Sequence, residues 1–298
     1  MASQRDVKNR ISSVKNIQKI TRAMEMVAAA RLRRAEQRIA ALRPYAQAIR
    51  RMTHQAAGAA GAEVASFGLL REHESERNVG LLLITGDRGL AGGFNSQIIR
   101  AGVRAGTQLS EQGLQPVWYA TGRRGVSSLT FRGRELSGSY TGFADRPGYA
   151  DARSIADDLI TAYVDGRLDR VEILYNAYIS PLTQEVARQT LLPLSQAAIE
   201  GEAEPEPQPA GARALVEYEP DPAAILQRLV PDYVEISIYR ALIESAAGFY
   251  GAQMTAMRNA SENAGTLIEE YTLQMNRARQ AEITQEIMEV VAGAEGLQ

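Results

Sequence analysis

A glycine-rich loop is the first feature of this sequence that could do chemistry. It covers residues 86–95, Gly-Asp-Arg-Gly-Leu-Ala-Gly-Gly-Phe-Asn, and lies between an apolar segment and a helical one. A loop in that place can bind the phosphates of a dinucleotide at the first turn of the helix. This loop lacks the G-x-G-x-x-G spacing of that class, and the chain has no Gly-Lys pair for a P-loop. We therefore interpret it as a tight turn, with Asn95 or Ser96 capping the following helix.

Residues for acid–base, nucleophilic or metal chemistry are sparse. The chain has no cysteine, which excludes disulfides, thiolate nucleophiles and every zinc site built on cysteine. Its two histidines, His54 and His73, are too few for a histidine metal cluster, and we interpret both as surface residues. The carboxylate pairs Asp157-Asp158 and Glu269-Glu270 fall on polar helix faces, where solvated surface is the simpler interpretation. We expect no catalytic residues, no metal, no cofactor and no direct nucleotide binding.

The charge is strongly uneven along the chain. Residues 1–52 carry thirteen basic and three acidic side chains, a net charge of +10, so the remainder carries −12 within a total of −2. A basic segment of this density indicates a solvated helix face, an acidic partner or nucleic acid. Tyr45 is the only aromatic residue before Phe67, so bases would have almost nothing to stack on. We therefore expect no nucleic-acid partner.

The elements that would position these residues begin with a long helix. Residues 3–55 contain no glycine and a single proline, Pro44, which should bend or interrupt the helix. A heptad seam of alternating four- and three-residue steps indicates a partner helix and runs through Ala28, Leu32, Ala35, Ile39, Leu42, Ala46 and Ile49. Less regularly, it continues upstream through Val7, Ile11, Val14, Ile17, Ile20, Met24 and Val27. The predicted helix has about 50 residues and a length of about 80 Å.

A second long helix is predicted at the other end of the chain. We place its start at Pro231, beside Asp232, and expect about 95 Å up to Ala294. Its seam runs through Tyr250, Met254, Met257, Ser261, Ala264, Ile268, Tyr271, Met275 and Ala278, and resumes after a phase slip at Ile283, Ile287, Val290 and Ala294. Helices this long cannot both be buried in one globule, so we expect them to pair antiparallel.

The middle of the chain has the pattern of an α/β domain. Strands are predicted at 79–85, 117–120 and 171–175, with helices from about Asn95, near 150–165 and near 183–190. The acidic, proline-rich stretch within 201–215 reads as a flexible linker. No apolar run is long enough to span a membrane, and Met1–Arg22 does not resemble a signal peptide.

The predicted fold class is therefore α/β: a long antiparallel coiled coil formed by the N- and C-terminal helices, plus a central Rossmann-like α/β domain. We divide the chain into four parts: a first long helix at 1–56, the central domain at 77–200, the linker at 201–215 and a C-terminal segment with the second long helix at 218–298.

Several segments of the chain carry a recognisable pattern: RISSVKNIQKITRAMEMVAAARLRRAEQR from Arg10, LLITGDRGLAGGFN from Leu82, VEILYNAYISPLTQEVARQTLLPL from Val171, YEPDP from Tyr218, and ARQAEITQEIMEVVAGAEG from Ala278. In this order they resemble the gamma subunit of F-type ATP synthases. In the last of these, the family's signature positions are occupied by Ile283, Thr284, Glu286, Glu289, Gly293 and Ala294. The chain departs from the family at Gly86 and Ala91, where Ser and Cys are frequent, and at Gly296, where the signature has Ser, Ala, Lys or Arg.

The resemblance implies a mechanical part, the rotor shaft of a rotary ATP synthase. Its partners would be three alpha and three beta subunits for each copy, the epsilon subunit and the membrane c-ring. It would couple proton- or ion-driven rotation of the ring to ATP synthesis or hydrolysis on the beta subunits. The implied location is peripheral, on the cytoplasmic face of a bacterial plasma membrane. Two other functions stay open on the residues alone: a coiled-coil scaffold without rotation, and a nucleotide-binding enzyme with helical arms.

The resemblance also implies contact residues. Arg279 and Gln280 match the family's catch with a loop of the beta subunit, and Thr284 and Glu286, in the same signature, are expected to belong to this contact. A further set, on the first helix and opposite the catch, is Arg22, Met24 and Glu25. The residues expected to meet the c-ring at the foot of the shaft are Arg43, Tyr45, Tyr218 and Glu219.

Overall fold

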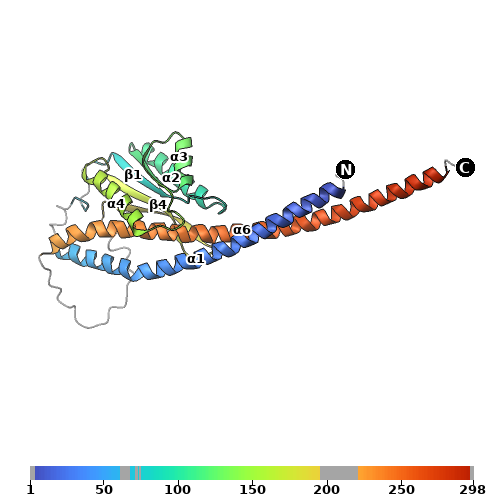
Figure 1. Cartoon of the computed structure of the whole chain (residues 1–298). Coiled ribbons are helices and arrows are strands. Elements are labelled where there is room, and N and C mark those ends of the chain that lie inside the picture. Colours follow the sequence, from blue (N-terminus) through green and yellow to red (C-terminus); the bar gives the residue numbers. More distant parts are fainter. Residues whose placement is uncertain (1–3, 61–67, 71–72, 74, 195–220, 296–298) are drawn as a thin grey trace. The chain divides into compact units, whose positions relative to one another are not determined.

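The computed structural model (Figure 1) describes residues 4–60, 68–70, 73, 75–194 and 221–295. The residues divide into two compact units, Met1–Ala29 with Gln253–Gln298, called here the helical unit, and Ala30–Ala252, called the α/β unit. In chain order the elements are α1 (Gln4–Ala60), β1 (Asn78–Ile84), α2 (Phe94–Glu111), β2 (Gln115–Thr121), α3 (Arg123–Phe131), β3 (Leu136–Tyr140), α4 (Tyr149–Val164), β4 (Arg170–Tyr178), β5 (Gln184–Leu192) and α6 (Pro222–Glu295).

A five-stranded sheet with the order β3-β2-β1-β4-β5 forms the centre of the α/β unit. The first four strands are parallel, and β5 runs antiparallel to β4. Leu81 and Leu83 of β1 pack with α2 on one face of the sheet, and Leu82 and Ile84 pack with α4 on the other. Because both faces are covered, the strand carries no polar side chain from Val79 to Ile84, as its sequence predicted.

The long helices take part in the core of the α/β unit. Val234, Ile238 and Leu242 of α6 pack with α4 against the sheet. A separate cluster joins Ile49 and Ala56 of α1 to a group of residues in the first turns of α6, Leu226, Leu229, Val230 and Tyr233. Further along, Arg38 and Arg31 of α1 contact Tyr239 and Tyr250 of α6. The residue numbers fall on α6 as they rise on α1, so within this unit the two helices are antiparallel (Figure 1).

In the helical unit the first part of α1 and the last part of α6 also pair antiparallel. Gln18 Nε2 donates a hydrogen bond to the carbonyl oxygen of Ser261 at 3.3 Å, and Glu25 forms an ion pair with Arg258 at 2.9 Å. Met257 and Ala264, predicted seam residues of α6, are buried. The predicted coiled coil is therefore confirmed. Of the helices in the described ranges, none carries a stretch that is long and apolar enough to cross a lipid bilayer.

The upstream seam predicted for α1 is wrong at three positions. Ile17, Ile20 and Val27 are more than half exposed. The regular four- and three-residue steps instead pass through three polar residues with lower exposure, Gln18, Thr21 and Glu25. Each of these makes a hydrogen bond or ion pair that satisfies its polar group. Polar partners thus determine this part of the interface, and an apolar stripe stays on the surface.

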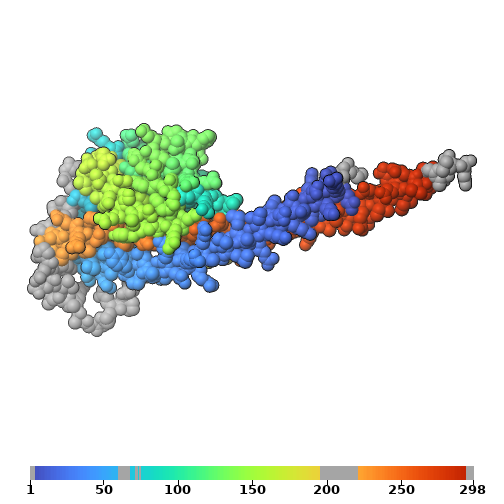
Figure 2. All heavy atoms as spheres, in the orientation of Figure 1, coloured from blue at the N-terminus to red at the C-terminus, as the bar shows by residue number. Residues whose placement is uncertain are grey.

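The seam predicted beyond Ala278 is also wrong. Ile283, Ile287 and Val290 are exposed, at 47%, 57% and 73%. Figure 2 shows the reason: the last turns of α6, in red, extend past the first turn of α1, in dark blue. No residue of α1 in the described range is left to cover them.

The predicted start of the C-terminal helix is corrected by nine residues. The helix begins at Pro222, and Asp221 caps it through a 2.7 Å hydrogen bond from the Ala224 backbone N–H to its carboxylate. Asp221 and Pro222 are an acidic cap followed by proline at the first helical position, whereas Pro231, where we placed the start beside Asp232, lies inside α6. Pro44 likewise lies inside α1, which continues across it without interruption.

The helix predicted near 183–190 is wrong, because this segment forms strand β5. It pairs with β4 through partners such as Ala187 with Tyr175 and Gln189 with Ile173. The predicted linker lies outside the described residues, and the four-part division of the chain stays a prediction.

The loop before β1 is fixed by Asp169. One of its carboxylate oxygens accepts hydrogen bonds from the backbone N–H groups of Arg77 and Asn78, both at 2.8 Å, and the other lies 3.1 Å from Nδ1 of His73. Burial raises the pKa of Asp169, but the backbone hydrogen bonds and His73 outweigh burial and hold the pKa below its ordinary value. His73, predicted as a plain surface residue, therefore anchors this loop.

We expect acid to remove the stability that Asp169 contributes. A carboxyl group with a depressed pKa in the folded state stabilises the protein fully above its unfolded pKa of about 3.9, and this contribution is lost as the pH falls through the folded pKa. Asp169→Asn should lower the free energy of unfolding by about 1–2 kcal/mol at pH 7 and flatten its decline below pH 4. Urea unfolding across this pH range measures both effects. A variant that declines as steeply as the parent would contradict the assignment.

Candidate functional site

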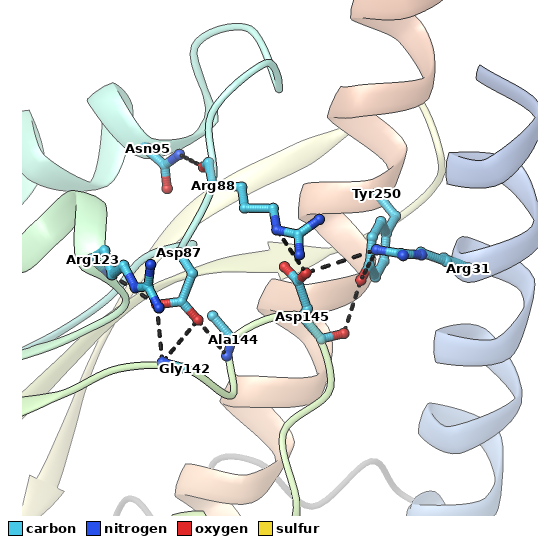
Figure 3. Close-up of polar contacts among 9 residues, drawn as sticks. All are labelled: Arg31, Asp87, Arg88, Asn95, Arg123, Gly142, Ala144, Asp145 and Tyr250. Carbon is cyan, nitrogen blue, oxygen red and sulfur yellow. Dashed lines mark hydrogen bonds and ion pairs between the residues drawn. The ribbon is translucent and has the colours of Figure 1, made fainter. Parts of the chain in front are cut away.

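The glycine-rich loop lies at the carboxyl end of β1, where open α/β sheets bind ligands. Asp87 dominates its geometry (Figure 3). The carboxylate accepts hydrogen bonds from the backbone N–H groups of Arg123 at 3.0 Å, Gly142 at 3.0 Å and Ala144 at 3.1 Å. These donors lie at the start of α3 and in the loop after β3. An anionic side chain of the protein thus holds the N–H groups that could otherwise bind a phosphate.

Asn95 closes the same loop on itself. Its Oδ1 accepts a hydrogen bond from the Gly86 backbone N–H at 2.8 Å, and its Nδ2 donates one to the carbonyl oxygen of Arg88 at 3.0 Å. The helix α2 has Gly93 as its N-cap without a side-chain hydrogen bond. The prediction that Asn95 or Ser96 caps α2 is therefore wrong. The helix already starts at Phe94, so Asn95 lies inside its first turn. The Asn95 side chain instead bonds back to the backbone of Gly86 and Arg88.

The helix α6 covers this edge of the sheet closely. A methyl group on Gly86 would lie 3.1 Å from the ring of Phe249, and the rings of Phe94 and Phe249 meet edge to face with centroids 5.6 Å apart. A methyl group on Gly251 would lie 2.7 Å from the carbonyl oxygen of Pro181. The Phe249 side chain of α6 thus packs directly on the glycine-rich loop, and the α6 backbone packs on the turn between β4 and β5, which supports the interpretation of the loop as a structural turn.

Asp145 joins four parts of the α/β unit. Its carboxylate lies 3.3 Å from Nε of Arg88 and 3.7 Å from Nη1 of Arg31, and its carbonyl oxygen accepts a 2.9 Å hydrogen bond from the Tyr250 hydroxyl (Figure 3). The guanidinium of Arg31 also lies 5.6 Å from the centroid of the Tyr250 ring. We call Arg31, Arg88, Asp145 and Tyr250 the Asp145 junction. It connects α1 and α6 with the loops after β1 and β3.

The electrostatics of the Asp145 junction favour a protonated Tyr250. Burial and then the charge of Asp145 raise the pKa of Tyr250, and Arg31 opposes them only in part. The phenol therefore stays a hydrogen-bond donor at neutral pH. The junction is structural in character, since none of its groups is a base next to a nucleophile.

We expect the Asp145 junction to stabilise the α/β unit modestly. Its ion pairs are partly exposed, so each contributes little, and Asp145→Ala should lower the free energy of unfolding by about 1–2 kcal/mol. Asp157 is the matched control, because its carboxylate makes one exposed contact of 4.0 Å with Arg153. Asp157→Ala should change stability by less than about 0.5 kcal/mol in the same urea titration. Equal effects of the two substitutions would show that the Asp145 junction does not stabilise the unit.

The structure does not bring the predicted shaft contacts together. Arg22 is exposed, Met24 is half-buried, and Glu25 pairs with Arg258 and not with the region of Arg279. Arg279 lies roughly 30 Å further along α6 at 1.5 Å per residue. Because the register pairs residue 25 with residue 258, Arg22, Met24 and Glu25 do not lie opposite the catch, and their role as shaft contacts stays a prediction.

The remaining predicted contacts lie on exposed surfaces or outside the described ranges. Arg279, Gln280 and Glu286 are exposed, and the Thr284 hydroxyl donates a hydrogen bond to the carbonyl oxygen of Gln280 at 2.8 Å. Arg43 and Tyr45 are exposed on α1 beside Pro44. Tyr218 and Glu219 lie outside the described residues. The roles of all these residues stay predictions.

The other candidate residues have structural surroundings. Asp158 accepts a 2.7 Å hydrogen bond from Tyr140, while Glu269 and Glu270 are exposed. Among the residues that the structure describes, no group of three or more His, Asp or Glu side chains could hold a metal ion. Sequence reasoning missed Arg31, Asp145 and Tyr250 as one group. The only signal was indirect, since Tyr250 heads the predicted seam of α6 and Arg88 lies in the glycine-rich loop.

Sequence comparisons connect almost the whole chain to one family. The family model described as ATP synthase matches residues 3–297. The ATP synthase gamma chain of Rubrobacter xylanophilus is 43% identical over 297 residues, which cover 100% of this chain and 99% of that one. The gamma chain of Moorella thermoacetica is 41% identical and covered completely.

Solved structures show the same fold. The chain is similar to one from the central stalk and c-ring structure of the Tetrahymena thermophila mitochondrial ATP synthase, with a TM-score of 0.62 and 24% identity, over 81% of this chain and 99% of that one. A chain from the Euglena gracilis mitochondrial ATP synthase gives a TM-score of 0.65 with 15% identity, over 99% and 94%. At these identities the likeness supports the Rossmann-like domain and paired helices as a fold.

Proposed function

This chain belongs to the family of ATP synthase gamma chains, and from that membership we propose that it is the central rotor shaft of an F-type ATP synthase. It couples rotation of a membrane ring, driven by protons or another ion, to conformational change at catalytic subunits that make or hydrolyse ATP. The full-length similarity to bacterial gamma chains supports this function.

One structural observation carries the proposal: both long helices contribute to both units, and α1 is bound to the α/β unit by side chains. Within that unit, Arg31 contacts Asp145, the Tyr178 hydroxyl donates to Glu36 at 2.5 Å, and Arg38 donates to the carbonyl oxygen of Pro147. The chain passes between the units within α1 and within α6. Torque applied to the α/β unit is therefore transmitted to the helical unit through two helices.

The helical unit suits a part that turns inside a ring of other subunits. Its surface carries exposed apolar residues on α1, Ile17, Ile20, Met26 and Val27, and on the end of α6, Ile283, Ile287, Val290 and Val291. With these two apolar stripes, the surface of the helical unit is not the same in every direction. When such a shaft turns, it presents a different surface to each surrounding subunit and shifts that subunit's conformational equilibrium. ATP chemistry then takes place on the partners, and this chain is a non-catalytic subunit.

The partners follow from the same proposal. They are three alpha and three beta subunits for each copy of this chain, the epsilon subunit and the c-ring. The chain is peripheral to the membrane, on the cytoplasmic face of the bacterial plasma membrane. Its relatives in Rubrobacter and Moorella support a bacterial complex of this kind.

Reconstitution tests the proposed function. This chain should restore coupled ATP hydrolysis and proton pumping to complexes that lack their gamma subunit, and it should purify with alpha and beta subunits in a ratio of one to three of each. A non-rotary scaffold would purify with partners but restore no coupling. Assembly without coupling in reconstituted vesicles would therefore favour the scaffold.

We expect the isolated chain neither to bind nor to hydrolyse ATP. Asp87 of the glycine-rich loop occupies backbone donors at the start of α3 and in the loop after β3, and the ring of Phe249 packs against Gly86. Isothermal titration of the purified chain with ATP should show no saturable heat. Binding in the micromolar range, abolished by a substitution in the 86–95 loop, would revive the nucleotide-binding enzyme as an alternative.

A further inference from the structure

An arginine-lined groove lies on the α/β unit, away from the Asp145 junction. Its volume is about 430 Å³. The lining residues come from one face of α2 and from the neighbouring strands β4 and β5: Gln97, Arg100, Ala101, Arg104, Ala105, Gln108, Leu174, Val186 and Arg188. Three of them carry a positive charge and none carries a negative charge. We call this surface the α2–β5 groove.

We propose that the α2–β5 groove is a docking surface for an extended acidic segment of a partner protein. Every residue on which this proposal rests lies within the α/β unit, so the proposal does not depend on the rotor function.

The arginines on α2 are placed to bind anionic groups from outside. Arg100 and Arg104 are exposed and one helical turn apart. Two like charges at this spacing repel and weaken a helix by a few tenths of a kcal/mol, so helix stability does not account for them. Nε of Arg100 donates to the carbonyl oxygen of Ser96 at 3.2 Å. The guanidinium of Arg104 has no hydrogen bond or ion pair with any residue in the described part of the chain.

The third arginine is held in position across the groove. Nε of Arg188 lies 2.6 Å from the carboxylate of Glu172, and its Nη1 donates to Oε1 of Gln108 at 3.3 Å. Glu172 is buried and also contacts Arg170 at 3.2 Å, so it forms a fixed anchor inside the sheet. Since Arg188 is oriented before any ligand arrives, little rotamer entropy remains to be lost when it binds a carboxylate.

The shape and surroundings of the groove favour a peptide over a phosphate compound. Its lining includes Ala101, Ala105, Leu174 and Val186, which offer apolar contact to side chains. The α2 residues lie within a helix, where backbone N–H groups are already paired, so no backbone cradle for phosphate forms. β5 is the last strand of the described sheet, and an extended segment could lie along its outer edge. Carboxylates on alternate residues of such a segment would face the arginines.

Fluorescence anisotropy with the full chain tests this inference. The probe is a fluorescein-labelled ten-residue peptide of alternating Glu and Ala, compared with one of alternating Gln and Ala, at low ionic strength because salt screens exposed charges. We expect saturable binding of the Glu peptide only. Arg100→Glu with Arg104→Glu should weaken it at least tenfold, and Arg188→Gln severalfold.

The control is a second double charge reversal, Arg33→Glu with Arg34→Glu, on two exposed arginines of α1 within the α/β unit. It changes the net charge equally and should alter affinity less than twofold. Equal losses in both double variants, or equal binding of the two peptides, would overturn the proposal. Tripolyphosphate that binds more tightly than the Glu peptide would overturn it in favour of a phosphate site. If the charge reversal on α2 fails to fold, Arg100→Gln with Arg104→Gln replaces it, with a severalfold loss expected.

Discussion

Gly122→Ala should prevent the α/β unit from folding stably. Gly122 has a backbone φ of 80° and lies between the end of β2 and the start of α3. A methyl group there would lie 2.2 Å from the carbonyl oxygen of Thr85 and 2.7 Å from its carbonyl carbon. These atoms belong to the backbone at the end of β1. The Thr85 N–H donates a 3.1 Å hydrogen bond to the Thr121 carbonyl, so the Thr85 backbone cannot move without breaking the sheet edge. We expect a loss of about 3–5 kcal/mol or more.

Gly113→Ala separates the steric cost from the cost of a positive φ. Gly113 also has a φ of 80°, at the end of α2, but no other part of the described structure comes within 4 Å of the position of its missing methyl group. This substitution should cost only about 1 kcal/mol, the penalty of a left-handed conformation in a residue other than glycine. Urea unfolding, or the yield of folded protein where unfolding cannot be measured, compares the two variants. Equal losses would show that the contact with Thr85 has no consequence.

Much of the fold could be predicted because its signals are local and repeated. β1 is a run of consecutive apolar residues, and a strand of that kind must be covered on both faces. The heptad seam of α6 from Tyr250 to Ala278 repeats over many turns, so single exceptions do not hide it. Each of these patterns depends on the periodicity of one element and needs no knowledge of a distant partner.

The errors arose where a distant partner decides the structure. β5 was predicted as a helix because its segment has helix-forming residues such as Ala187 and Gln189, whereas pairing with β4 makes it a strand. The seam of α1 passes through Gln18 and Glu25, and an apolar pattern could not identify it because Ser261 and Arg258 satisfy these polar groups. Both cases are tertiary contacts that override a local pattern.

The candidate site was predictable only in part, for the same reason. The glycine-rich loop was found from its composition, but its closure depends on Asp87 bonding to Gly142 and Ala144, which lie more than fifty residues away in the chain. The Asp145 junction likewise joins residues from four separate segments. No spacing in the sequence could assemble them, because the fold and not the local chain determines the distances.

Replacing Arg279 and Gln280 by alanine should lower ATP turnover of the assembled complex about tenfold. Both side chains are exposed on α6, beyond Ala278, the last half-buried seam residue. The Thr284 hydroxyl bonds the Gln280 carbonyl, a backbone group that alanine retains. The substitution therefore removes side chains that could contact a surrounding subunit, without removing a contact of the coil. One charge-assisted hydrogen bond lost in the rate-limiting step corresponds to about 1.4 kcal/mol, a factor of ten.

Asn276→Ala with Arg277→Ala is the matched control, because both residues are also exposed on α6 and the pair also removes one positive charge. The control should keep most of the turnover, while both double variants keep the subunit ratio and the helix content measured by circular dichroism. Arg can bind a carboxylate in a directional, two-pronged geometry, and such a contact can be made and broken once in each passage. A general loss of positive charge, in contrast, would act at any exposed position. Full turnover in an assembled Arg279→Ala and Gln280→Ala complex would leave these residues as ordinary helix surface. Equal losses in both pairs would attribute the effect to charge alone and would remove the proposed catch.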